Sequence, residues 1–106
     1  MPDALRFLLT DLRTALQNHY GDRLVQLVLY GSHARGEAHQ ESDVDVMVVL
    51  QGSVDPVGEI RQISPLVLDT GLTHEKLITI YPISAADYKS RQTALLQSIY
   101  QEGVPL

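Results

Sequence analysis

The sequence predicts an α/β (α+β) fold in which a small mixed β-sheet is flanked by helices. Three observations lead to this fold class. Two apolar runs of strand length lie at residues 24–30 and 43–50, an amphipathic helix precedes them, and a helix, a strand and another helix follow. With 106 residues, the chain is expected to form one domain over residues 1–106.

The first element is a helix expected over residues 3–20. Its leucines recur at the i, i+3, i+4 spacing that places side chains on one face, so we expect this face to cover the sheet. Gly21 is expected to end the helix. His19 and Tyr20 are interpreted as surface or capping residues. The leucines that form the stripe are Leu5, Leu8, Leu9, Leu12 and Leu16.

Two strands are expected next, at residues 24–30 and 43–50. The first has Gln26 as its only strongly polar residue, which is typical of a strand covered on both faces. In the second, side chains alternate between faces, so Asp43 and Asp45 should share one face with their Cα atoms about 6.6 Å apart. Two carboxylates this close repel each other, and a hard divalent cation would relieve the repulsion.

The loop between these strands carries residues suited to binding phosphate. Gly31 allows the backbone to turn and to approach a ligand closely. A short helix opening at Ser32 would direct N–H groups and a hydroxyl at an anion, and Arg35 can hold a phosphate oxygen in a fork. The alternative interpretation is a glycine turn whose neighbouring acids only guard a sheet edge. His33 and His39 are six residues apart, a spacing that does not favour a zinc site.

A second helix is expected after the second strand. Asp55 and Pro56 fit its first positions, and Gly71 fits its end. Pro65 in the middle of this segment predicts a kink or two short helices, because proline removes a hydrogen bond and clashes with the preceding turn. Glu59 is interpreted as part of a solvated face.

A third strand and a last helix complete the predicted elements. The strand is expected over residues 75–83, with Pro82 at a sheet edge or a strand end. The helix is expected to begin at a capping box headed by Ser84 and to run to Glu102. The order helix, strand, loop, strand, helix, strand, helix is what the predicted fold class requires.

A spaced motif runs through the centre of the chain. Gly31 and Ser32 are followed by ten residues and then by Asp43 and Asp45, and the first part has the extended form GSHARG. This motif resembles that of the nucleotidyltransferase superfamily that includes DNA polymerase β. Among its branches, the chain is similar to the minimal nucleotidyltransferase (MNT) domain, a small α/β unit often paired with a HEPN partner as the antitoxin of a toxin–antitoxin module.

The resemblance implies a role for each residue of the motif. Gly31, Ser32 and Arg35 would bind ATP or another NTP. Asp43 and Asp45 would be the catalytic residues and would hold Mg²⁺ or Mn²⁺. Family members transfer a nucleoside monophosphate to a hydroxyl, and in the antitoxin branch this hydroxyl belongs to a tyrosine of the HEPN-type toxin, which is adenylylated and silenced.

The sequence departs from the family pattern at one point. Active members of the superfamily usually carry a third carboxylate on the strand that follows the next helix. Here the middle of that strand holds Thr79, and the nearest acids, Asp69 and Glu75, are not at the expected position. Two functions therefore stay open: a magnesium-dependent nucleotidyltransferase, or a catalytically weak or inactive binding module that acts as an antitoxin by complex formation.

Composition bounds the remaining function classes. The 8 basic and 13 acidic residues give a formal net charge of −5 at pH 7. Because the basic residues are scattered, we expect no extended nucleic-acid surface. There is no cysteine, so any metal site must use oxygen or imidazole ligands. No apolar run approaches the roughly 18 residues that cross a bilayer, and the first residues are unlike a signal peptide, so we expect a cytoplasmic protein without a membrane partner.

Overall fold

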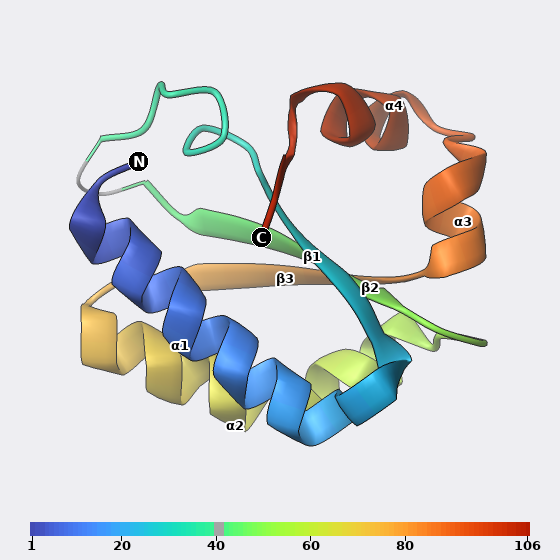
Figure 1. The fold of residues 1–106 in the computed structure, drawn as a ribbon, viewed down its shortest axis with the longest axis horizontal. Coiled ribbons are helices and arrows are strands. Elements are labelled where there is room, and N and C mark those ends of the chain that lie inside the picture. Colours follow the sequence, from blue (N-terminus) through green and yellow to red (C-terminus); the bar gives the residue numbers. More distant parts are fainter. Residues whose placement is uncertain (40–41) are drawn as a thin grey trace.

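The structure is a computed structural model that describes residues 1–39 and 42–106. It confirms the predicted fold class, with a four-stranded mixed sheet and helices on both of its faces (Figure 1). The elements in chain order are α1 (Asp3–Tyr20), the 3-10 turn η1 (Gly21–Arg23), β1 (Leu24–Tyr30), β2 (Val44–Leu50), α2 (Pro56–His74), β3 (Ile78–Ser84), α3 (Ala85–Ser90), α4 (Ala94–Glu102) and β4 (Val104–Pro105).

The sheet has the strand order β3-β2-β1-β4. Strand β1 is antiparallel to both β2 and β4, whereas β2 and β3 are parallel because α2 forms the crossover between them. The sequence did not predict β4. It has two residues, one of them Pro105, and is held at the edge of β1, where the Leu106 N–H donates to the Leu27 carbonyl at 2.9 Å.

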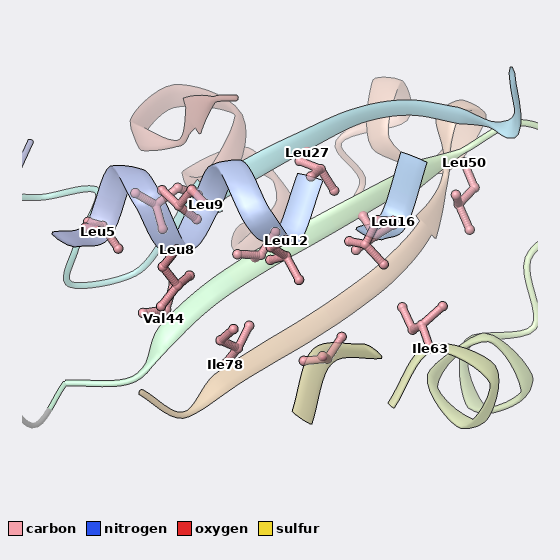
Figure 2. Close-up of a cluster of buried hydrophobic side chains, with 14 residues drawn as sticks. Leu5, Leu8, Leu9, Leu12, Leu16, Leu27, Val44, Leu50, Ile63 and Ile78 are labelled. Atoms are coloured by element: carbon pink, nitrogen blue, oxygen red, sulfur yellow. The ribbon is translucent and has the colours of Figure 1, made fainter. Parts of the chain in front are cut away.

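Alternation along β2 divides the core into two layers. One face of the sheet packs against α1 and α2, and the leucine stripe of α1 lies on it, as predicted (Figure 2). The opposite face packs against α3 and α4, through Met47 and Val49 of β2 and through Leu96 and Ile99 of α4. The side chains of β2 that enter the first layer are Val44, Val46, Val48 and Leu50.

Helix α2 is continuous, so the predicted division at Pro65 is wrong. Ile63 and Val67, on either side of the proline, are both buried in the same core layer, and this packing holds the two halves of the helix in line. The helix also runs past Gly71 to His74. Glu75 then ends it in a left-handed conformation, with φ 55° and ψ 42°, which delays the start of β3 to Ile78.

The last predicted helix is divided into α3 and α4. Arg91 follows α3 with φ 49°, a left-handed value that stops an α-helix. Thr93 then caps α4 by accepting a hydrogen bond from the Leu96 N–H at 3.1 Å. The cap predicted at Ser84 is confirmed, since its hydroxyl oxygen accepts from the Asp87 N–H at 3.1 Å.

The end of α1 is tied to α2 by a polar cluster, which corrects two interpretations. Glu59 is buried, not solvated, at 7% exposure, and forms an ion pair of 2.7 Å with Arg23. Tyr20 is half-buried and donates its hydroxyl to Glu59 at 3.2 Å, so it is not a simple surface or capping residue. Burial, followed by the negative charge of Glu59, raises the pKa of Tyr20 to about 12.

Within residues 1–39 and 42–106, no helix is both long and apolar enough to cross a membrane.

Candidate functional site

The last residue of β1 and the first residues of β2 lie side by side in the sheet. Tyr30 is the cross-strand partner of Asp45, and Thr79 of β3 is the partner of Asp45 on the other side. Directly paired residues point to the same face, so these three side chains form a row on the face that also carries Met47. Asp45 is half-buried. Asp43, one residue before β2, is exposed, and its alignment with Asp45 on one face stays a prediction.

Gly31 brings the loop backbone against the Asp45 carboxylate. It has φ +75°, in the left-handed region that favours glycine. A Cβ atom at this position would overlap Asp45 Oδ2 and would lie 3.3 Å from Asp45 Cγ. The position therefore requires glycine for two reasons, its backbone conformation and the closeness of the acid. The turn that follows β1 and the carboxylate of β2 consequently share one small region.

The predicted short helix at Ser32 is a single hydrogen-bonded turn. The Arg35 N–H donates to the Gly31 carbonyl at 3.2 Å, and the Glu37 N–H donates to the Ser32 carbonyl at 3.0 Å. Gly36, with φ +72°, then redirects the chain. A turn of this kind still leaves its first N–H groups outside the hydrogen-bonding of the turn, which is the property that suits an anion.

Side-chain contacts stabilise the loop while Arg35 stays accessible. Arg35 Nε donates to Glu37 Oε2 at 3.1 Å, and both side chains are largely exposed, so this pair contributes at most about 1 kcal/mol. Ser42 and His39 exchange two hydrogen bonds of 3.0 Å, so Ser42 is held to the loop just before β2. Arg35 can thus leave its partner for a phosphate at little cost.

Most of the chain matches a known protein family. Residues 9–97 match the family described as Nucleotidyltransferase domain. This chain belongs to the nucleotidyltransferase domain family. The predicted resemblance is therefore confirmed, and the matched range contains every residue of the motif that begins at Gly31.

Individual relatives agree with this assignment. Over 41 residues, this nucleotidyltransferase is 44% identical to a candidate protein adenylyltransferase of Methanocaldococcus jannaschii. That match covers 39% of each chain, so it spans about two fifths of the relative's length.

Solved structures share the fold. The structure of a candidate minimal nucleotidyltransferase aligns with a TM-score of 0.61 and 23% identity, covering 96% of this chain and 95% of that one. A toxin–antitoxin crystal structure with AMP-PNP aligns with a TM-score of 0.62 and 19% identity, covering 89% and 68%. A complex of a tri-AMPylated Shewanella oneidensis HEPN toxin with an MNT antitoxin gives a TM-score of 0.54 and 14% identity, covering 92% and 70%.

Strand β3, where the resemblance led us to expect a third carboxylate, places a hydroxyl beside Asp45. Thr79 lies in register with Asp45, and its Oγ1 donates a hydrogen bond to Asp45 Oδ1. Asp69 lies in α2 and Glu75 ends that helix; both are exposed, on the side of the sheet that α2 covers, and so they do not approach Asp45.

Mg²⁺ and Mn²⁺ prefer carboxylate and other oxygen donors. In the described part of the chain, no group of three or more His, Cys, Asp and Glu side chains is placed to hold a metal. The motif supplies two carboxylates, those of Asp43 and Asp45. Magnesium in nucleotide sites commonly takes one or two carboxylates and completes its shell with phosphate oxygens and water. The residues present therefore fit a cation that arrives with a triphosphate.

Tyr30 is a site residue that the sequence analysis did not single out. Its pKa is raised above the ordinary value by burial first, then by the negative charge of Asp45 and by the neighbouring Tyr81 phenol. Its phenol thus stays neutral beside the acid. Finding Tyr30 beside Asp45 requires the register between β1 and β2. Alternation along each strand does not give this register, because a loop of thirteen residues, 31–43, separates the two strands.

Proposed function

We propose that this nucleotidyltransferase transfers AMP from ATP to the hydroxyl of a tyrosine on a HEPN-type toxin partner, and that it acts in the cytoplasm as the antitoxin. The observation that carries the proposal is the packing of the Gly31 backbone against the Asp45 carboxylate. This contact joins a phosphate-binding turn to an acid that can hold a cation. The fold family and the adenylyltransferase relative support the same chemistry.

Each residue of the motif has a role in this proposal. Gly31 and Ser32 bind the triphosphate through the backbone and the hydroxyl, and Arg35 contacts a phosphate oxygen. Asp43 and Asp45 are the catalytic residues and the ligands for Mg²⁺ or Mn²⁺, which when bound neutralises charge on the triphosphate. Most of the rate enhancement then comes from positioning and charge stabilisation.

The proposed reaction is a displacement at the α-phosphorus of ATP. The acceptor oxygen forms a bond to this phosphorus, the bond to the bridging oxygen breaks, and pyrophosphate leaves. The acceptor hydroxyl loses its proton to solvent or to a nearby base. A tyrosine of a HEPN-type toxin is proposed as the acceptor because a fold relative is described as an MNT antitoxin in complex with a tri-AMPylated HEPN toxin.

The second candidate function is a binding module that silences its partner by complex formation. Thr79 favours this alternative, because it stands where active members carry a third acid and already donates to Asp45. In that case nucleotide binding would be vestigial or structural. The two functions differ in whether inhibition of the partner requires ATP.

One experiment separates these functions. The chain is copurified with its partner, incubated with labelled ATP and Mg²⁺ or Mn²⁺, and both proteins are weighed by mass spectrometry. Transfer predicts a gain of AMP mass on the partner with wild type and none with Asp43→Asn/Asp45→Asn, while circular dichroism shows that the variant is folded. Equal inhibition of the partner by wild type and variant, without a mass gain, would support pure binding instead.

A further inference from the structure

Asp45 is held by different groups on its two carboxylate oxygens. Oδ1 accepts the hydrogen bond from Thr79 on β3, and Oδ2 lies against the backbone at Gly31. The carboxylate is therefore fixed between the edge strand of the sheet and the motif loop. On the β1 side its paired neighbour is Tyr30, whose phenol is uncharged, so both paired neighbours of Asp45 carry neutral hydroxyls.

We propose that Thr79 is a positioning residue that orients Asp45, and that the site consequently takes one divalent cation and not two. This inference rests on the proposed function and specifies its metal requirement. A second cation needs oxygen ligands of its own, and a third carboxylate beside the shared acid would supply them. A threonine hydroxyl supplies no negative charge, and here its proton is committed to Asp45 Oδ1.

The number of carboxylates at the site leads to the same conclusion. Asp43 and Asp45 provide two negative charges, and no other acid of the described residues is grouped with them. Two carboxylates, completed by phosphate oxygens and water, are the usual ligand set for one divalent cation. A hydrogen bond from a neighbouring residue to a metal-ligating carboxylate commonly changes metal affinity by about 10–100-fold when it is removed. The Thr79 hydroxyl is therefore expected to affect the metal without touching it.

The test counts Mn²⁺ ions by electron paramagnetic resonance. Mn²⁺ is titrated into the protein with equimolar AMP-PNP, the signal of free Mn²⁺ is recorded, and a protein-free sample gives the amount bound by the nucleotide alone. Thr79→Val removes the donor at nearly constant volume, and Thr79→Ser restores it. Thr79→Asp adds the missing acid. Thr10→Val is the matched control, because Thr10 is exposed on α1 and donates only to the Arg6 carbonyl.

The expected result is one Mn²⁺ per wild-type complex, bound more tightly than by the nucleotide alone. Thr79→Val should keep one ion and bind it about tenfold more weakly, while Thr79→Ser and Thr10→Val behave as wild type. Thr79→Asp should take two ions. Two ions in wild type, one ion in Thr79→Asp, or equal affinity in wild type and Thr79→Val would each overturn the inference.

Failure of the proposed function would look different. In that case wild type and Asp45→Asn would both bind Mn²⁺ no more tightly than the nucleotide alone, and the inference about Thr79 would fall with it.

Discussion

Replacing Gly31 by alanine tests the two reasons why this position requires glycine, its backbone conformation and the closeness of the Asp45 carboxylate. Its φ of +75° costs a residue with a Cβ about 1–2 kcal/mol. The new Cβ would also overlap the Asp45 carboxylate, which would have to leave its hydrogen bond with Thr79. Because Asp45 is half exposed, we take about 1 kcal/mol for that bond. The expected loss of unfolding free energy is therefore about 2–3 kcal/mol.

Gly52 is the matched control for this substitution. It has φ +77°, and a Cβ at this position would meet no atom within 4 Å. Gly52→Ala should therefore show only the backbone cost of about 1–2 kcal/mol. The difference of about 1 kcal/mol between the two variants corresponds to roughly 4–8 °C in melting temperature for a chain of this size.

The assay has two parts, urea unfolding followed by circular dichroism and calorimetric titration with AMP-PNP and Mg²⁺. Gly31→Ala should lose more stability than Gly52→Ala and should also lose nucleotide affinity, because the acid is displaced. Gly52→Ala should bind nucleotide as wild type does. Equal stability losses in the two variants, with nucleotide affinity unchanged in Gly31→Ala, would refute the proposed contact between the loop and Asp45.

Three further predictions concern groups outside that contact. The pKa of Tyr20 is raised from 10.0 to about 12, so its contribution to stability is present below pH 10 and is lost as the pH rises to about 12. The urea midpoint should therefore fall less steeply between pH 10 and pH 12 in Tyr20→Phe than in wild type. Glu59→Ala should lower the unfolding free energy by about 2 kcal/mol in thermal melts, because it leaves Arg23 and Tyr20 without their buried partner. A loss no larger than that of the exposed control Glu75→Ala would contradict the burial of the cluster. Arg35→Ala should weaken AMP-PNP binding while the melting temperature stays constant, and the exposed control Arg61→Ala should change neither quantity. A fall in melting temperature with normal AMP-PNP binding would mean that Arg35 stabilises the fold and does not bind the nucleotide.

The elements that follow from periodicity were predicted closely. The bounds of α1 and β1 agree with the leucine stripe and with the apolar run that follows it, because one buried face fixes each pattern. The turn at Gly31 was predicted as well from the conformational freedom of glycine, and the φ of +75° agrees with it.

What the sequence did not reveal depends on neighbours far away in the chain. Glu59 is buried because Tyr20 of α1 and Arg23 of η1 bind its carboxylate. An amphipathic sequence pattern does not show that a charged residue has such partners. The bond between Thr79 and Asp45 depends on the register of a parallel pair, which the crossover helix sets. Strand β4 is too short to produce a pattern.

The most direct test of the central claim is calorimetric titration of the protein with AMP-PNP in the presence and absence of Mg²⁺. The claim is that the carboxylates beside the Gly31 loop hold a metal–nucleotide complex. It predicts binding that requires Mg²⁺, that disappears in Asp43→Asn/Asp45→Asn, and that is intact in Thr10→Val. Binding of equal strength without Mg²⁺, or in the double variant, would contradict the claim.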